Sequence, residues 1–401
     1  MQEVLIFDCV RTPRGRARLG GGLYEVAPHQ LVADLLHAIT DRLSLDPSEV
    51  ADLLLGCVTP VGDQGYNIAQ ASLLAARWPD GVAGAQVNRY CASGLESIHS
   101  AAARITAGWD DLIVAGGVES MSRVPLGSDG GPLLDNPSLM LETAAIPQGI
   151  SADLIASLHD MSRETLDRFA LQSQSRAEVA RKNKLFKKSL IAIEDGNGIV
   201  LLEEDEHPRP SSTLEALGSL SPAFAKTGEK GFDALALRRY PILAAIEHRH
   251  TAGNSSGLVD GASLVVLGNE ATGKKIGLKP RARIRAVAVA SSEPTIMLMG
   301  MIPATEKVLA KADLTIAHID LIEINEAFAA VPLAFMRHFG IDDTKVNVNG
   351  GAIALGHPVG ATGAMLVGTI VDELEKRKKK LGLVTLCAGG GQGIAAIIER
   401  V

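Results

Sequence analysis

Apolar positions divide the chain into short runs typical of strands and longer runs with helical spacing. In the first part of the chain the two kinds alternate, beginning with an apolar run over residues 4–7. The expected elements are a strand over 4–7, a helix over 31–43, a strand over 53–57, a helix over 67–76, a strand over 85–87, a helix over 92–107 and a strand over 112–115, with one further strand over 263–267.

The last part of the chain repeats this order of elements. The expected elements are a strand over 284–289, a helix over 304–312, a strand over 321–324, a helix over 326–338, a strand over 346–348, a helix over 362–376 and two strands over 383–386 and 394–398. Both halves therefore read βαβαβαββ. Such a duplication predicts an α/β fold with two helix-covered sheets, packed face to face so that equivalent loops meet at a shared cleft.

A long segment between the two halves breaks the pattern. It holds Pro-rich turns, one strong helix over 163–182 and an irregular stretch over 205–212, which favour an inserted lid or loop domain. The expected division is an N-terminal half of residues 1–120 plus about 251–275, an inserted domain of residues 121–250 and a C-terminal half of residues 276–401.

Composition and charge fit a compact globular protein. Hydrophobic residues make up 46% of the chain, yet the longest apolar runs, such as 113–117, are far shorter than a membrane span of ~20 residues. We therefore expect a soluble protein with no membrane span. A net charge of −7 argues against a general nucleic-acid binder. The chain begins directly with a strand-like run and no signal segment, so a cytoplasmic location is expected.

The cysteines are widely spaced and show no CxxC pattern, which favours reduced thiols over disulfides or a zinc site. Cys9 and Cys57 end apolar runs and are expected to be small buried side chains. Cys91 is different, because it follows an expected strand and begins an expected helix. A helix N-terminus favours the thiolate, although position alone leaves open a nucleophile or a structural thiol.

His357 lies in the Gly-rich loop 349–358, which corresponds in the second half to the loop of Cys91. If the halves pack about a pseudo-two-fold axis, His357 faces Cys91 and can serve as its general base. The loop lacks the Gly-Lys-Ser/Thr ending of a phosphate loop. A lone histidine in such a loop is more often structural, so the pairing with Cys91 decides how it is interpreted.

Two further strand ends carry polar side chains. Asn325 ends the second expected strand of the second half, and Cys387 ends the fourth, before a run of three glycines. Asn325 can orient a water or the imidazole, and the glycine run can offer N–H groups to an oxyanion. The alternatives are an Asn that caps the next helix and a buried thiol at a tight turn.

Two cysteines, one histidine and one asparagine at four strand ends give a pattern that resembles the thiolases. That family includes acetyl-CoA acetyltransferases and 3-ketoacyl-CoA thiolases, and the resemblance covers essentially the whole chain. The resemblance implies the family's five-layer αβαβα arrangement. The matching segments are Cys91-Ala92-Ser93-Gly94, Thr251-Ala252-Gly253-Asn254-Ser255-Ser256-Gly257, Asn325-Glu326-Ala327-Phe328, Gly356-His357-Pro358 and Cys387-Ala388-Gly389-Gly390-Gly391.

The resemblance also implies a role for each residue of the site. Cys91 is acylated, His357 activates it, and Cys387 removes or returns the α-proton of the acetyl unit. The backbone N–H groups of Cys91 and Gly389 hold one thioester oxygen, and His357 with a water on Asn325 holds the other. The residues implied to line the path of CoA are Ser256, Ala327 and Phe328.

The implied reaction is reversible. A 3-ketoacyl-CoA and CoA give acetyl-CoA and a shortened acyl-CoA, or acetyl-CoA units condense. CoA and acyl-CoA thioesters are the expected partners, with CoA as a substrate, no metal or other cofactor, and a homodimer or homotetramer as the assembly. The alternatives are a short-chain acetyl-CoA acetyltransferase, a condensing ketosynthase and a non-catalytic thiolase-like lipid-binding protein.

Two segments depart from the family pattern. Residues 147–149 read Pro-Gln-Gly, where many thiolases have His-Met-Gly beside the acyl pocket. Ser221 stands where many relatives carry an arginine that covers the adenine of CoA. The expected replacements are Arg238, Arg239 or the basic helix 163–182. The long insert and the altered loop 147–149 favour degradation of longer 3-ketoacyl-CoA substrates, as in β-oxidation.

Overall fold

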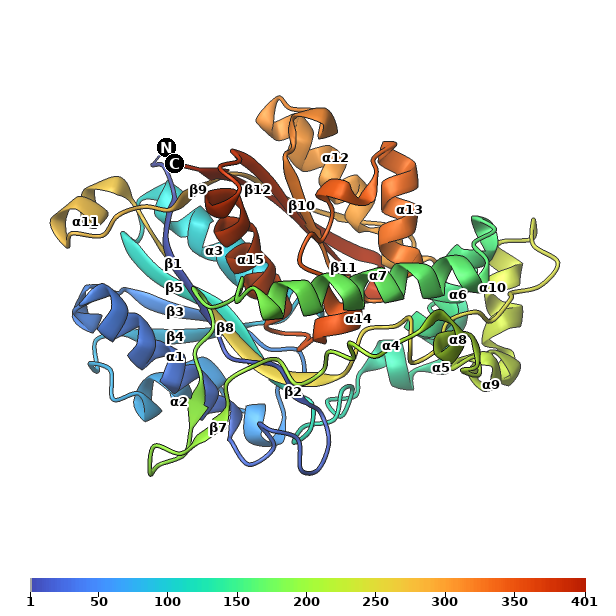
Figure 1. Ribbon diagram of the computed structural model, residues 1–401, viewed down its shortest axis with the longest axis horizontal. Helices are drawn as coiled ribbons and strands as arrows, with labels where there is room; N and C mark the ends of the chain where they lie inside the picture. Colours follow the sequence, from blue (N-terminus) through green and yellow to red (C-terminus); the bar gives the residue numbers. More distant parts are fainter. Residues whose placement is uncertain (1) are drawn as a thin grey trace.

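The computed structural model describes residues 2–401, and its centre is one large mixed β-sheet (Figure 1). The sheet has ten strands in the order β10-β11-β12-β9-β1-β8-β5-β3-β4, with the short β2 paired to β8. The strands are β1 (Leu5–Arg11), β2 (Gly15–Arg16), β3 (Asp52–Gly56), β4 (Ala83–Val87), β5 (Leu112–Ser120), β8 (Val259–Gly268), β9 (Ala282–Ser291), β10 (Leu321–Ile324), β11 (Leu381–Ala388) and β12 (Gln392–Arg400).

The two halves of the sheet have matching strand orders, as the duplication predicts. They are continuous, however, because β1 and β9 pair through Leu5 with Arg283 and Ile6 with Ala282. The expectation of two separate sheets is therefore wrong. Apolar spacing identifies each strand, but it does not say whether the outer edges of two strands will hydrogen-bond.

One expected strand is absent among the described residues. Val346 makes only an isolated bridge to Ile322. The side chain of Asn347 takes over the pairing, since its Oδ1 accepts from the Ile324 N–H at 2.8 Å and its Nδ2 donates to the Ile324 carbonyl at 2.9 Å. The prediction of a strand over 346–348 is therefore wrong, because an amide side chain here replaces backbone pairing.

The helices and the two halves of the sheet form five layers, with helices between the halves and on the outer face of each half, which confirms the predicted α/β fold. Helices α3 (Ser93–Ala107) and α15 (Thr362–Lys376) form the middle layer, and one buried cluster joins them to strands of both halves. The outer helices are α1 (Pro28–Leu43) and α2 (Ile68–Ala75) on the N-terminal half, and α12 (Met301–Ala312) and α13 (Ala330–Phe339) on the C-terminal half.

The beginnings of α3 and α15 touch through their backbones. A Cβ atom at Gly94 would lie 2.6 Å from the Gly360 carbonyl oxygen, and one at Gly363 would overlap the Leu95 backbone. Only glycine permits this approach. The loops that lead into the two helices, which carry Cys91 and His357, therefore open at the same place.

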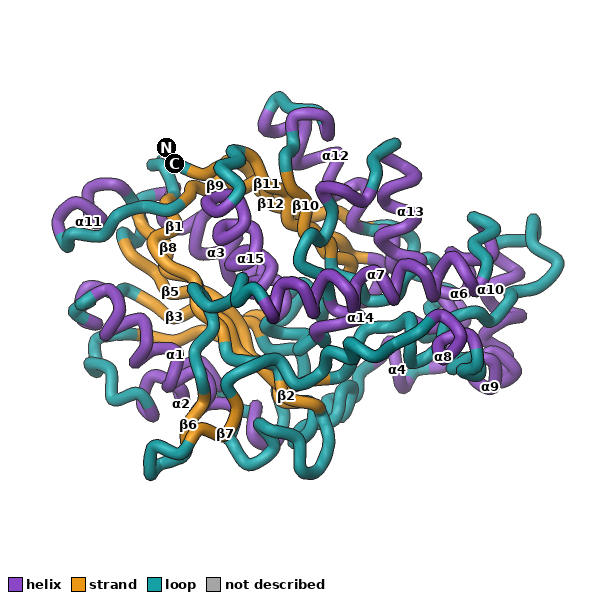
Figure 2. The backbone as a smooth tube through the Cα atoms, in the orientation of Figure 1, coloured by secondary structure: helices purple, strands orange, loops and turns teal. Residues whose placement is uncertain are grey.

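The segment between the halves is rich in loops (Figure 2). Helix α7 (Arg163–Lys182) keeps its predicted bounds and packs on α14 (Ala352–Leu355), and the chain then returns to the N-terminal half of the sheet through β8. No helix within residues 2–401 is long and apolar enough to cross a membrane. The remaining elements are α4 (Pro132–Asp135), α5 (Pro137–Thr143), α6 (Gln148–Leu158), α7 (Arg163–Lys182), β6 (Ile193–Glu194), β7 (Val200–Leu202), α8 (Leu214–Gly218), α9 (Ala225–Thr227), α10 (Asp233–Arg239), α11 (Glu270–Lys275) and α14 (Ala352–Leu355).

Candidate active site

Cys91 lies in a tight turn between β4 and α3. The turn is held by the Tyr90 N–H, which donates to Asn88 Oδ1 at 2.9 Å, and by Ser93 Oγ, which donates to the Tyr90 carbonyl at 2.6 Å. Tyr90 itself has a φ of +48°, a left-handed conformation that is uncommon for a bulky residue. The turn places the Cys91 thiol inside the protein, with 8% of the residue exposed.

Burial determines the protonation state of this thiol. It raises the pKa of Cys91 to about 11, and the carboxylate of Glu119 adds to the rise, while a hydrogen bond from the Gln148 side chain opposes it. The thiol is therefore protonated in the free protein, because the loss of solvation outweighs the favourable effect of the helix N-terminus. A base must remove the proton when the thiol reacts.

His357 is held in the protonation state that such a base needs. Its Nδ1 lies 2.6 Å from Thr362 Oγ1, and this hydroxyl donates its own hydrogen to the Pro358 carbonyl at 2.9 Å. These bonds assign the proton to Nδ1 and leave a lone pair on Nε2, which lies 3.2 Å from Asn325 Nδ2. Burial, reinforced by Arg14, lowers the pKa of His357 to about 3. The imidazole is therefore neutral.

Asn325 and Cys387 lie at adjacent strand ends, as expected. Strands β10 and β11 are parallel neighbours, and the Asn325 N–H donates to the Thr385 carbonyl at 3.1 Å. Burial raises the pKa of the Cys387 thiol, and the charge that Cys91 carries as a thiolate raises it further. The two thiols therefore lie close to each other. Asn325 Oδ1 is buried with no hydrogen-bond partner among the described atoms.

The glycine run after Cys387 reaches the Cys91 turn. A Cβ at Gly389 would lie 3.0 Å from the Tyr90 ring, and Gly390 and Gly391 have φ values of +70° and +86°. Glycine is needed for both the contact and the turn. The two backbone segments predicted to hold an oxyanion, at Cys91 and Gly389, are thus neighbours.

The expected CoA-contact residues also lie together. The Ser256 N–H donates to the Ala327 carbonyl at 3.0 Å, and Ser255 and Phe328 form an antiparallel bridge. The Phe328 ring meets the Phe224 ring edge to face at 5.7 Å between centroids. Phe224 in turn lies directly on Gly149, next to Gln148, so this wall adjoins the Cys91 thiol.

Three residues have roles in the site that the sequence analysis did not assign, although residues 147–149 stood out there as a departure from the family pattern. Thr362 orients His357, the Gln148 side chain lowers the pKa of the Cys91 thiol, and Glu119 links the loop after β3 to the loop before α15. The buried Glu119 carboxylate accepts from the N–H groups of Val58 at 2.9 Å and Gly360 at 3.0 Å, and burial raises its pKa to about 7. Such roles depend on how loops from distant parts of the chain meet.

The basic residues expected to bind the CoA nucleotide differ in their exposure and in their ion pairs. On α7, Arg181 pairs with Glu178 at 3.0 Å and with Glu204 at 2.9 Å, so its charge is compensated. Arg238 and Arg239 end α10 and are exposed, with Glu293 4.0 Å from Arg239. Across the described part of the chain, no group of three or more His, Cys, Asp or Glu side chains is arranged to hold a metal ion.

Comparison with known proteins gives full-length matches. The model "Thiolase, N-terminal domain" matches residues 4–231, and "Thiolase, C-terminal domain" matches residues 278–400. The chain is 40% identical over 410 residues to a 3-ketoacyl-CoA thiolase of Shewanella frigidimarina and 39% identical over 408 residues to one of Klebsiella pneumoniae, with 100% of each chain covered. The crystal structure of the Bacillus anthracis acetyl-CoA acetyltransferase matches with a TM-score of 0.86 and 36% identity, covering 100% of this chain and 99% of that one.

Proposed function

The chain belongs to the thiolase family and is an acyltransferase, and from this premise we propose how its own residues carry out the reaction. The reaction is the reversible, CoA-dependent cleavage of a 3-ketoacyl-CoA to acetyl-CoA and a shortened acyl-CoA. Its difficult steps are the attack of a thiol on a ketone and the departure of an enolate.

In the first half-reaction, His357 Nε2 takes the proton of Cys91 as Sγ attacks the keto carbon of the substrate. The N–H groups of Cys91 and Gly389 stabilise the oxyanion that forms there. The C–C bond then breaks, and the leaving enolate of acetyl-CoA takes a proton from Cys387 at its α-carbon. His357 and a water on Asn325 stabilise the enolate oxygen.

In the second half-reaction, Cys387 removes the proton of an incoming CoA thiol, and the CoA sulfur attacks the acyl group on Cys91. The tetrahedral intermediate collapses to the shortened acyl-CoA, and Cys91 recovers its proton from His357. The kinetics should be ping-pong, because acetyl-CoA leaves before CoA enters.

The observation that carries this proposal is the fixed tautomer of a neutral, buried His357. Thr362 holds Nδ1, so the lone pair of Nε2, which accepts from Asn325 Nδ2 at 3.2 Å, is the position that can take a proton. A pKa of about 11 for Cys91 makes such a base necessary.

We further propose that the chain degrades 3-ketoacyl-CoA substrates longer than acetoacetyl-CoA, as in β-oxidation. The names of the relatives at 39–40% identity support this, while the Bacillus anthracis neighbour supports the short-chain alternative. Assembly as a homodimer or homotetramer is supported by β4, a partly exposed edge strand with a free side for pairing. The free cysteines support a reducing, cytoplasmic location.

The decisive test is CoA-dependent cleavage of acetoacetyl-CoA and of a longer 3-ketoacyl-CoA by wild type, Cys91→Ser and Cys387→Ser. Both variants should lose turnover by about 10³-fold or more. Intact-protein mass spectrometry should detect an acyl adduct on Cys387→Ser and none on Cys91→Ser. Turnover by Cys91→Ser near the wild-type rate would refute the mechanism, and the wild-type rate ratio decides chain length.

A further inference from the structure

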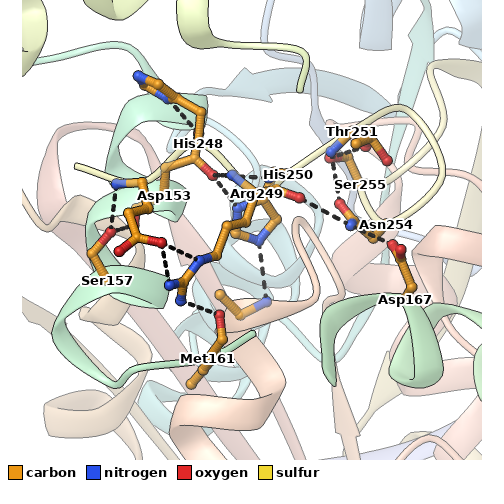
Figure 3. A network of polar contacts seen from close by, with 12 residues as sticks. Asp153, Ser157, Met161, Asp167, His248, Arg249, His250, Thr251, Asn254 and Ser255 are labelled. Carbon is orange, nitrogen blue, oxygen red and sulfur yellow. Dashed lines mark hydrogen bonds and ion pairs between the residues drawn. The ribbon is translucent and has the colours of Figure 1, made fainter. Parts of the chain in front are cut away.

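A buried acidic side chain outside the site described above gathers an unusual set of donors. Asp153, on α6, is fully buried, and its Oδ1 accepts from His250 Nδ1 at 2.7 Å, the His250 N–H at 2.9 Å and the Arg249 N–H at 3.0 Å (Figure 3). Its Oδ2 contacts His248 Nδ1 at 2.9 Å. One carboxylate therefore fixes a segment of three residues that leads directly into the Thr251–Gly257 motif.

His250 connects this segment to the C-terminal half of the protein. It is fully buried, and while Nδ1 donates to Asp153, Nε2 accepts from the Ala330 N–H at 3.4 Å. Its ring meets Phe328 edge to face at 5.6 Å between centroids. Ala330 is the first residue of α13, whose N-cap Ala329 has no side-chain cap. His250, from another part of the chain, therefore accepts a hydrogen bond from a backbone N–H group at the start of this helix.

The residues after His250 continue the same contact. The Ala329 N–H donates to the Asn254 carbonyl at 3.0 Å, and the Ser256 N–H donates to the Ala327 carbonyl at 3.0 Å. Asn254 is itself held, since its Nδ2 donates to Asp167 Oδ1 at 2.8 Å. The irregular turn from Asn325 to α13 thus packs against the segment that follows His250. The hydrogen bond between Asp153 and His250 fixes the start of that segment.

We propose that His250, oriented by Asp153, is a positioning residue for Asn325 and Phe328, and that it acts mainly on the enolate-forming step. This rests on the proposed function, in which Asn325 supports the oxyanion of the acetyl-CoA enolate and Cys91 with Gly389 supports the acyl oxyanion. A small displacement of the 325–329 turn disturbs the first site and leaves the second, on other loops, in place.

The two half-reactions can be measured separately. Exchange of isotopically labelled CoA into an unlabelled acyl-CoA needs only acyl transfer to and from Cys91, whereas thiolysis of a 3-ketoacyl-CoA needs the enolate as well. Damage to the fold lowers both rates together. A change in the ratio of thiolysis to exchange therefore reports positioning and not stability.

His250→Phe keeps the aromatic contact with Phe328 and removes both ring hydrogen bonds. It is expected to lower thiolysis about tenfold and exchange no more than about twofold, both per folded molecule. The matched control is His248→Gln, which shares Asp153 but is bonded on its other side to Asp233 at 2.9 Å. Its thiolysis-to-exchange ratio should equal that of the wild type.

A ratio within about twofold of wild type for His250→Phe overturns the proposal. If that variant does not fold, Asp153→Asn decides, because Oδ1 can still accept while the charge that orients His250 is gone. A ratio about threefold below wild type supports the proposal, and an unchanged ratio overturns it. Absence of thiolysis in the wild type would instead defeat the proposed function.

Discussion

The two halves of the sheet place different side chains at equivalent positions. Cys57 and Asn325 are each the first residue after a strand, β3 and β10. Glu119 and Cys387 each lie two residues beyond the partner of that strand's last residue, which is Gly117 in β5 and Thr385 in β11. We call this edge of each half-sheet, where these strands end, its rim. The structure thus contains two equivalent rims with different polar side chains.

In the N-terminal rim, Glu119 and its neighbours form hydrogen bonds within the fold. Glu119 accepts from the backbone of three separate positions and from Gln64 Nε2 at 2.7 Å, and it approaches Cys57 Sγ at 4.0 Å. In the C-terminal rim, Asn325 Oδ1 has no partner within residues 2–401. The N-terminal rim therefore serves as a scaffold that supports the Cys91 turn. The C-terminal rim keeps a polar side chain that can bind a reacting group.

The sharpest test of this division is a pair of matched substitutions. Asn325→Ala should lower kcat for thiolysis about 10²-fold, because it removes support for an oxyanion. Cys57→Ala, at the equivalent position, should leave kcat within about twofold of wild type and cost about 1 kcal/mol of stability through lost packing. Steady-state kinetics and urea unfolding check both. Equal losses of kcat in the two variants would contradict the division.

A second, smaller effect should come from the residue that orients His357. Thr362→Val keeps the shape of the side chain and removes the oxygen that accepts from Nδ1. The proton can then move to Nε2, so kcat should fall about tenfold with little change in KM. Thr362→Ser restores the acceptor and should recover most of the rate. A Thr362→Val enzyme with wild-type kcat would show that the tautomer is not controlled by this hydroxyl.

The sequence predicts elements whose spacing is regular and local. The bounds expected for α7, β10 and α15 are confirmed, since each follows from apolar spacing within one element. The expected helix over 326–338 begins only at Ala330, because the backbones of Ala327 and Ala329 bond instead to Ser256 and Asn254, in the segment after His250. Local propensity cannot detect such competition between distant segments.

For the candidate site, the sequence predicts which residues come together, but it does not predict their protonation states or hydrogen-bond partners. The repeat predicts that the loops of Cys91 and His357 meet, and the contact of α3 with α15 brings them together. The roles of Thr362 and Gln148, and the neutral thiol of Cys91, depend on side-chain directions and burial that only the packed structure provides.

Glu119 should matter for stability more than for the reaction. Burial raises its pKa in the folded protein from an ordinary 4.5 to about 7. A raised pKa means that the folded state holds the proton more tightly than the unfolded state. The contribution of Glu119 is therefore most favourable below pH 4.5 and is lost as the pH rises towards 7.

Glu119→Gln removes this titration while it keeps the side chain's size. Wild type should lose up to about 3 kcal/mol of unfolding free energy from this group between pH 4.5 and 7, and the variant should lack that part of the slope. Urea unfolding at several pH values measures the difference. The variant should keep kcat within about threefold per folded molecule, because Glu119 supports the rim without touching the reacting atoms. If instead kcat fell as far as in Asn325→Ala, the N-terminal rim would share in the chemistry, and the scaffold interpretation of that half would be wrong.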